Sequence, residues 1–270
     1  MFKTRLISGV VLVILAILFI NTGGDLLLSV LLIISLIGMG ELYKTIGIHN
    51  NLPGVIGYLA AAGYYGIIRF TEIKWVLLLI FAFLIVIMAA YVFSFPKYNA
   101  EQITLAFFGV FYVAMMMSCI YLARNLPDGR FLVWLIFFSA WGCDTCAYCV
   151  GILFGKHKLA PKLSPKKSIE GSIGGIVGAA LLGLIYAACV NHFSGFMPGR
   201  MWKYPLICGL GAIIAQIGDL AASGIKRNHN VKDYGKLIPG HGGILDRFDS
   251  VIFTAPVIYF LGVFLSLVRK

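Results

Sequence analysis

Long apolar stretches separated by short polar segments run along the whole chain. The nine clearest runs cover approximately residues 6–21, 25–43, 54–70, 74–95, 102–123, 131–154, 169–190, 204–222 and 248–267. A helix that crosses the hydrocarbon core of a bilayer needs about 20 mostly apolar residues, and these runs approach or reach that length. We therefore predict an all-α polytopic membrane protein with about nine transmembrane helices and no soluble domain.

Composition supports the same fold class. Apolar residues make up 60% of the 270 residues and charged residues only 12%, whereas about a quarter of a soluble domain is charged. The first run follows Lys3 and Arg5, as the apolar core of a signal peptide would. No small-x-small cleavage pattern comes after it, so we interpret it as the first transmembrane helix.

The distribution of Lys and Arg predicts the orientation. If nine helices alternate across the bilayer, one side holds 14 of the 22 basic residues. This side receives the N-terminus, the loops at Lys44 and Lys97, and segments 156–167 and 223–247. Lys and Arg concentrate on the cytoplasmic side, so we expect the N-terminus inside and the C-terminus outside. Ten of the 14 lie in segments 156–167 and 223–247, more than anchoring alone requires.

The charge pattern also divides the chain. We expect residues 1–124 to form a transmembrane scaffold of about five helices. We expect residues 125–270 to form the catalytic region, with about four helices and the basic cytoplasmic loops 155–168 and 223–247.

Small residues in the second half have a packing interpretation. Gly171, Gly174, Gly175 and Gly178 would form a small face on one helix, which lets a neighbouring helix approach closely. Cys143, Cys146 and Cys149 have spacing reminiscent of a metal site, but no second cysteine pair completes one. We therefore interpret these cysteines as small buried apolar residues.

Five carboxylates belong to helices whose ends meet the predicted cytoplasmic side: Asp144, Glu170, Asp219, Asp246 and Asp249. Charges inside a bilayer are costly and usually functional, although each acid could instead simply pair with a nearby Lys or Arg. Carboxylates are ligands for Mg²⁺, and Lys and Arg bind phosphate groups. Together these groups favour phosphoryl or nucleotidyl transfer at a membrane surface.

Two blocks of sequence resemble a known family. The stretch from Ser223 to Asp249 reads SGIKRNHNVKDYGKLIPGHGGILDRFD, and the earlier block contains Asp144–Tyr148, Gly155–Lys158 and Ser164–Gly171. Both blocks resemble phosphatidate cytidylyltransferases, or CDP-diacylglycerol synthases. The resemblance covers about the last half of the chain, and the first half is similar only in hydropathy. The chain departs from the family pattern at Ala222, where many members have Glu, and at Ser168 and Ile169, where Thr and Trp are usual.

The resemblance implies Mg²⁺-dependent transfer of the cytidylyl group of CTP to phosphatidic acid, which releases pyrophosphate in phospholipid biosynthesis. It implies a second cation, divalent or monovalent, beside Mg²⁺. The expected location is the bacterial inner (plasma) membrane, with the active site facing the cytoplasm. CTP, phosphatidic acid and the lipid bilayer are the expected partners, and nucleic acid is not. A homodimer is left open.

The resemblance also implies residue roles. The expected metal ligands are Asp144, Asp219, Asp246 and Asp249. The expected catalytic residues are Asp219, Asp246, Lys226 and Arg247. The expected substrate-binding residues are Lys166, Lys167, Ser223, Arg227, Lys232 and His241. As alternatives, the aspartates could form buried salt bridges with Lys226 or Arg247, the basic residues could form a positive-inside cluster, and His241 could cap the last helix.

Two other functions are compatible with parts of the pattern. A CTP-dependent polyprenol or lipid kinase would transfer the γ-phosphate of CTP instead. A transporter would use intramembrane acids to couple ions to substrate, but the chain has no evident inverted repeat and its acids cluster near the rim. A CDP-alcohol phosphotransferase is excluded because its Asp-rich helix pair is missing.

Overall fold

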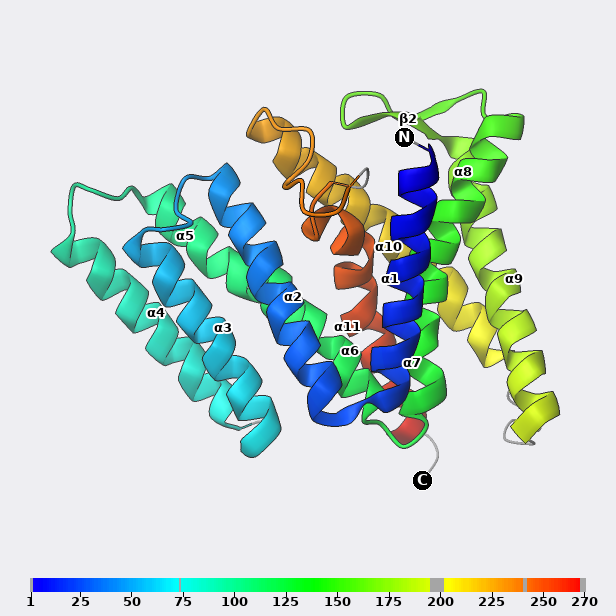
Figure 1. Ribbon diagram of the computed structural model, residues 1–270, viewed down its shortest axis with the longest axis horizontal. Coiled ribbons are helices and arrows are strands. Elements are labelled where there is room, and N and C mark those ends of the chain that lie inside the picture. Colours follow the sequence, from blue (N-terminus) through cyan, green and yellow to red (C-terminus); the bar gives the residue numbers. More distant parts are fainter. Residues whose placement is uncertain (1, 73, 195–201, 240–241, 268–270) are drawn as a thin grey trace. The chain divides into compact units, whose positions relative to one another are not determined.

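The computed structural model describes residues 2–72, 74–194, 202–239 and 242–267. In these ranges the chain forms helices with one small sheet (Figure 1). The single helices are α1 (Phe2–Thr22), α2 (Gly24–Thr45), α3 (Leu52–Phe70), α4 (Trp75–Phe93), α9 (Ile169–Ser194), α10 (Lys203–Asn228) and α11 (Leu245–Leu267). Two further helices each contain a π-helical segment: α5–η1–α6 (Ala100–Gly109, Val110–Met115, Met116–Arg124) and α7–η2–α8 (Gly129–Phe137, Phe138–Gly142, Cys143–Phe154). Each of the nine predicted runs therefore coincides with one continuous helix, which confirms the predicted fold class.

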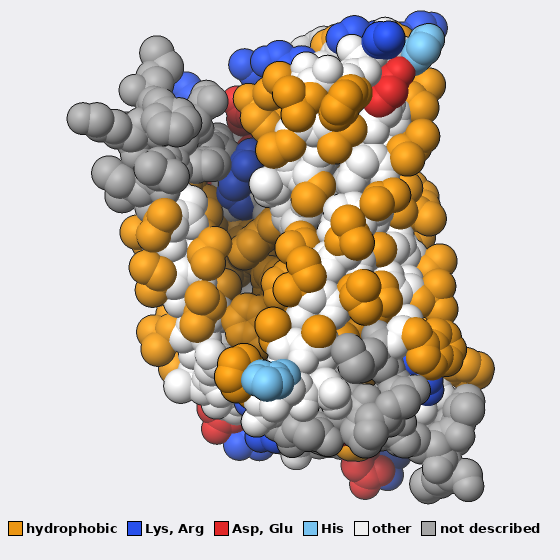
Figure 2. All heavy atoms as spheres, turned by 90° about the vertical axis from the view of Figure 1, so that its right-hand side faces the viewer, with side chains coloured by type: hydrophobic (Ala, Val, Ile, Leu, Met, Phe, Trp, Pro, Cys, Tyr) orange, Lys and Arg blue, Asp and Glu red, His pale blue; other side chains and the backbone are white. Residues whose placement is uncertain are grey.

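Seven of these helices, within the described ranges, are long and apolar enough to cross a membrane. Within α1, Ser8–Thr22 forms a shorter apolar helix, and α3 is outside the seven. Only 11% of the apolar window of α4 is buried by protein, so its side chains are suited to contact lipid. Figure 2 shows one face on which hydrophobic side chains cover the middle and Lys and Arg gather at the upper end. The chain is an integral membrane protein.

The helices group into two compact units. Unit 1 comprises Met1–Tyr121 and His229–Arg247, and unit 2 comprises Leu122–Asn228 and Phe248–Lys270. Segment 229–247 thus belongs with the N-terminal helices, whereas the region predicted to be catalytic runs without interruption from residue 125. Helix α11 begins in unit 1 and continues in unit 2.

Unit 1 is packed around the buried ring of Tyr43 on α2. The Tyr43 hydroxyl donates a hydrogen bond to the carbonyl oxygen of Ala106, at 2.6 Å. A Cβ atom at Gly57 or at Gly109 would lie 2.4 or 2.5 Å from this side chain. Glycine at both positions therefore allows α3 and α5 to approach the tyrosine closely.

Unit 2 is built on the close contact of α8 with α9, which lie side by side (Figure 1). A Cβ atom at Gly174 would meet Val150 at 2.5 Å, and one at Gly178 would meet Cys146 at 2.5 Å. The small face predicted for residues 171–178 is thus the surface on which α9 packs against α8. The prediction that the cysteines of α8 are buried is right for Cys143 and wrong for Cys149, which is exposed.

A short hairpin connects α8 to α9 where the sequence predicted only a basic loop. Strand β1 (Lys158–Ala160) pairs antiparallel with β2 (Ser164–Ser168), with Lys158 opposite Ser168. Its base is held by Glu170, whose carboxylate accepts hydrogen bonds from the backbone N–H groups of Lys156 and His157, at 3.1 and 3.2 Å. The hairpin therefore returns β2, and with it Lys167, to the end of unit 2 where α9 begins.

Candidate active site

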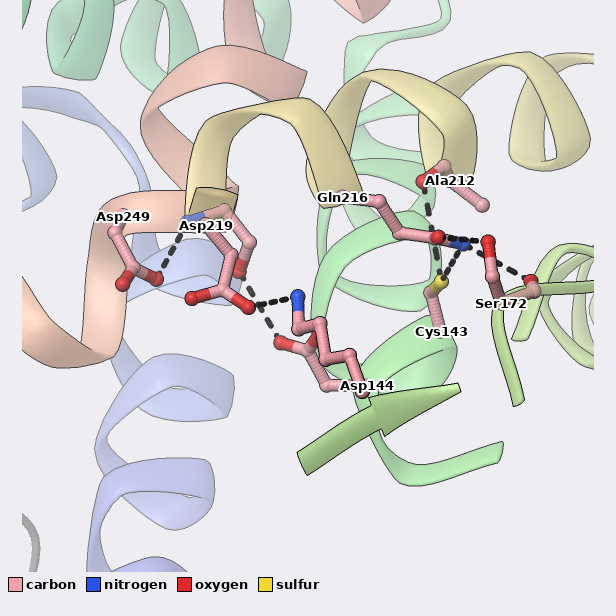
Figure 3. Close-up of polar contacts among 9 residues, drawn as sticks. Cys143, Asp144, Ser172, Ala212, Gln216, Asp219 and Asp249 are labelled. Carbon is pink, nitrogen blue, oxygen red and sulfur yellow. Dashed lines mark hydrogen bonds and ion pairs between the residues drawn. The ribbon is translucent and has the colours of Figure 1, made fainter. Parts of the chain in front are cut away.

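Three aspartates of unit 2 come from three different helices and point toward one another (Figure 3). Asp144 lies in the first turn of α8, Asp219 in the C-terminal half of α10, and Asp249 near the start of α11. Ser250 connects two of them, because its Oγ donates to Asp144 Oδ2 at 3.3 Å and its backbone N–H donates to Asp249 Oδ1 at 2.8 Å. The structure thus brings together three of the five carboxylates that the sequence predicted to converge.

The environments of these aspartates differ. Asp144 is exposed, the Asp219 side chain is 24% exposed, and Asp249 is buried. The negative charges of Asp219 and Asp144 repel that of Asp249, while the buried ammonium group of Lys226 attracts it. Because like charges at short range are unfavourable without compensation, this arrangement favours the binding of a cation.

Lys167 supplies part of that compensation. Its ammonium group forms an ion pair with the carboxylate of Asp219. The side chain of Lys167 is 26% exposed and extends from β2 of the basic hairpin. The hairpin is therefore linked electrostatically to the aspartates.

A buried polar cluster holds α8, α9 and α10 together beside the aspartates. Nε2 of Gln216 on α10 donates to the carbonyl oxygen of Ser172 on α9, at 3.0 Å, and to Sγ of Cys143 on α8, at 3.4 Å. Ser172 Oγ donates in return to Gln216 Oε1. Figure 3 shows this cluster next to Asp144 and Asp219. Cys143 immediately precedes Asp144, and Gln216 is one helical turn from Asp219, so the cluster fixes the backbone that carries both acids.

In unit 1, Asp246 organises the loop that leads into α11. Its Oδ2 accepts hydrogen bonds from the backbone N–H groups of Tyr234, at 2.8 Å, and Gly243, at 3.0 Å. Gly242 has φ of 86°, a conformation that disfavours residues with a side chain. Asp246 is buried, and one of its carboxylate oxygens is used by the protein itself.

Glu41 is a buried acid of unit 1 that the sequence pattern did not single out. It lies on α2, is 6% exposed, and accepts hydrogen bonds from the backbone N–H groups of Ile244 and Leu245, at 3.0 and 2.8 Å. It therefore caps the N-terminus of α11 from another helix. An acid within an otherwise apolar run was the available signal, but residues 1–124 were interpreted as scaffold.

The other residues that the sequence predicted for the site differ in their exposure and in the unit to which they belong. Glu170 was predicted to join the other acids, and its carboxylate is instead used to hold the hairpin, where it also contacts Nδ1 of His157 at 2.6 Å. Of the predicted substrate-binding residues, Lys166, Arg227 and Lys232 are exposed, Ser223 is partly buried, and His241 lies outside the described residues. Arg247 belongs to unit 1 and Lys226 to unit 2.

The donor set has the chemistry of a magnesium site, because hard divalent cations prefer carboxylate oxygens. Within the described ranges, however, no three His, Cys, Asp or Glu side chains are already arranged around one metal position. Asp219 is paired with Lys167. A cation that binds Asp219 therefore competes with the lysine.

The sequence of this chain is similar to those of known proteins along nearly its whole length. Residues 3–265 match the model of the Cytidylyltransferase family. The chain is 31% identical to the phosphatidate cytidylyltransferase of Staphylococcus haemolyticus over 96% of its own length and 98% of the relative's, and the protein of that name from Staphylococcus epidermidis gives the same values. The phosphatidate cytidylyltransferase of Brucella suis is 38% identical over 57% of this chain and 55% of its own. The chain belongs to the Cytidylyltransferase family.

Proposed function

We infer that the chain is a phosphatidate cytidylyltransferase, which converts CTP and phosphatidic acid into CDP-diacylglycerol and pyrophosphate. The observation that carries this inference is the similarity along nearly the whole chain to relatives with that activity in their name. The grouping of Asp144, Asp219, Asp249 and Lys167 at one end of unit 2 supports it, because anionic substrates need both cations and fixed positive charge.

In this reaction an oxygen of the phosphatidic acid phosphate attacks the α-phosphorus of CTP. A new bond forms between that oxygen and the α-phosphorus, and the bond to the oxygen bridging the α- and β-phosphorus atoms breaks. Pyrophosphate takes the electron pair and leaves. A phosphate monoester is already anionic at neutral pH, so the protein does not need a strong base to generate the nucleophile.

Asp144, Asp219 and Asp249 are the residues of unit 2 that would hold Mg²⁺. Bound there, Mg²⁺ would neutralise phosphate charge during transfer. Asp246, whose Oδ2 accepts hydrogen bonds from the backbone N–H groups of Tyr234 and Gly243, is the further metal ligand that the sequence predicts. A second cation remains part of the proposal.

The basic residues of the chain have separate tasks in this proposal. Lys167, which is paired with Asp219 in this structure, would be released if a cation bound Asp219, and its ammonium group would then contact the phosphates of CTP. Lys226, buried beside Asp249, would contact the leaving pyrophosphate. Lys166, Ser223, Arg227, Lys232, His241 and Arg247 complete the proposed phosphate-binding set.

The proposed location is the bacterial plasma membrane with the aspartates on the cytoplasmic side. CTP is soluble and reaches the site from the cytoplasm, whereas the acyl chains of phosphatidic acid stay in the bilayer. The excess of Lys and Arg on the side that carries the hairpin supports this orientation.

The direct test uses the purified chain in micelles that contain phosphatidic acid, Mg²⁺ and CTP labelled in cytosine. We expect label in the lipid, one pyrophosphate for each labelled lipid, and no product with EDTA. Asp219→Asn should abolish transfer. Asp25→Asn, which changes an exposed aspartate paired with Arg69 in unit 1, should retain it.

Label that stays in the aqueous phase, together with transfer of a γ-labelled phosphate to a lipid, would identify a kinase instead. Full activity of Asp219→Asn would exclude the proposed role of the three aspartates.

A further inference from the structure

Unit 1 contains a pocket of about 670 Å³ at the C-terminal end of α2. Its lining combines α2 with the loop that precedes α3, with Tyr58 of α3 and with residues 234–237. All of these residues belong to unit 1. None of them carries a role in the reaction as described above.

The pocket has an excess of positive charge. The lining includes the ammonium groups of Lys44 and Lys236, both exposed, and the carboxylate of Glu41. The carboxylate of Glu41 accepts hydrogen bonds from the start of α11. Gly235 packs closely against this carboxylate, because a Cβ atom at Gly235 would lie 2.3 Å from Glu41 Oε1. Among the described residues, neither Lys44 nor Lys236 forms a salt bridge. The two lysines can therefore bind an anion.

A neutral hydrogen-bonding pair lies beside these charges. His49 Nδ1 and the Tyr58 hydroxyl are 2.7 Å apart, and both side chains line the pocket. Gly40 leaves space for the pair, since a Cβ atom there would lie 3.3 Å from His49 Cε1. Burial and the nearby charge of Lys44 lower the pKa of His49. When Tyr58 donates to Nδ1, the neutral imidazole carries its proton on Nε2 and offers one more donor.

The rest of the lining is apolar. Leu36 and Ile37 come from α2, which is long and apolar enough to span the membrane, and Leu237 is 58% exposed at the loop. A free inorganic anion would gain nothing from this surface. A lipid whose charged headgroup joins an apolar body would use both parts.

We propose that this pocket binds the phosphate headgroup of phosphatidic acid, with Lys44 and Lys236 contacting the phosphate and Leu36, Ile37 and Leu237 contacting the glycerol and the first acyl carbons. This assignment rests on the function proposed above. A phosphomonoester carries up to two negative charges and matches two ammonium groups, whereas a phosphodiester lipid carries one. Tyr234 also lines the pocket and donates its backbone N–H to Asp246, so the loop that lines the pocket is held by Asp246.

The test measures the apparent KM for each substrate separately in mixed micelles. We expect Lys44→Gln/Lys236→Gln to raise the apparent KM for phosphatidic acid at least about tenfold, because two charged hydrogen bonds are lost. The apparent KM for CTP should change less than about twofold by the same reasoning. Lys97→Gln, which removes one exposed lysine outside the pocket, is the control for loss of a surface lysine and should leave both values unchanged.

A second variant leaves the charge intact. Leu237→Trp should narrow the pocket and raise the apparent KM for phosphatidic acid, whereas Leu59→Trp, at a position 68% exposed on α3, should not. Thermal stabilisation by short-chain phosphatidic acid provides a readout without turnover. It should be strong in the wild type, lost in the double-lysine variant, and not reproduced by phosphatidylglycerol or inorganic phosphate.

Each contrary result has a distinct meaning. An unchanged KM for phosphatidic acid in an active double-lysine variant would overturn the pocket assignment and leave the proposed function standing. A selective rise in the KM for CTP would assign the pocket to the nucleotide and also overturn the proposal. Absence of lipid cytidylylation by the wild type would refute the proposed function, and the thermal measurement would then still decide whether the pocket binds this lipid.

Discussion

Nε2 of Gln216, on α10, lies 3.4 Å from Sγ of Cys143, on α8, and donates a hydrogen bond to it. Each partner is close in sequence to an aspartate of the site, Asp219 in one case and Asp144 in the other. A single buried amide therefore fixes how two helices present their acids. We assign Gln216 a positioning role, since its contacts are with protein atoms and it acts on the site through the backbone.

Replacing Gln216 with Ala should reduce kcat about ten- to a hundredfold, because small displacements of reacting groups are costly. It should also raise the Mg²⁺ concentration for half-maximal activity. Steady-state rates measured across a Mg²⁺ titration would check both effects. Ser35→Ala removes a buried hydrogen bond of 2.8 Å to Tyr65 in unit 1 and serves as a control that should lower Tm without changing the Mg²⁺ dependence.

Cys143 offers a conservative comparison for the same cluster. Cys143→Ser keeps an acceptor for Gln216 and should retain most activity, whereas Cys143→Val removes the acceptor at similar size and should behave like Gln216→Ala. Equal activity of the two Cys143 variants would show that the contact with Gln216 has no positioning role.

The ion pair between Lys167 and Asp219 predicts opposite changes in two constants. Lys167→Gln removes a competitor for Asp219 and should lower the Mg²⁺ concentration for half-maximal activity. It also removes a cation for phosphate and should raise the KM for CTP, by about tenfold for one charged contact. Separate titrations of Mg²⁺ and CTP would measure this. A higher Mg²⁺ requirement in the variant would contradict the competition between lysine and metal.

Glu41 should contribute to stability through the start of α11. Glu41→Ala leaves two backbone N–H groups without their acceptor and should destabilise the protein by about 1–3 kcal/mol. Glu41→Gln keeps one acceptor oxygen and should cost less. Thermal unfolding in detergent would rank the variants, with Glu101→Gln, at an exposed position of α5, expected to match the wild type. An unchanged Tm for Glu41→Ala would disprove the capping role.

His49 predicts a pH dependence of stability. Burial, helped by the charge of Lys44, lowers its pKa below the usual 6.5. Between the folded-state pKa and the unfolded-state pKa, the unfolded chain binds more protons, so stability falls as the pH decreases below about 6.5. His49→Gln should flatten this part of the curve of Tm against pH. Parallel curves for the variant and the wild type would refute the assignment to His49.

Hydropathy predicted the helices well because a helix that crosses a bilayer needs about 20 consecutive, mostly apolar residues. The nine runs and the small face of α9 are properties of contiguous sequence, and both were correct. Asp144, Asp219 and Asp249 could be grouped because each interrupts an apolar helix, and such interruptions are rare without a function.

Other features depend on contacts that leave no local pattern. Glu41 resembles an isolated charge near a helix end until Ile244 and Leu245, more than 200 positions later, are placed beside it. Glu170 was grouped with the aspartates because it begins a helix on the same side, but its carboxylate accepts hydrogen bonds from the backbone N–H groups of Lys156 and His157 at the base of the hairpin. Hydrogen bonds to backbone atoms do not depend on the type of the partner residue, so the sequence of the partner gave no signal for either contact.

The discontinuous make-up of unit 1 also constrains how the protein is synthesised. The ribosome delivers α2 to the membrane long before the residues that bind Glu41 have been translated, since they follow it by 203 and 204 positions. The part of unit 2 that runs from Leu122 to Asn228 is made in that interval. In the nascent chain, α2 therefore enters the membrane before the carboxylate of Glu41 has its hydrogen-bond donors. Unit 1 reaches its final structure only when translation has passed residue 245.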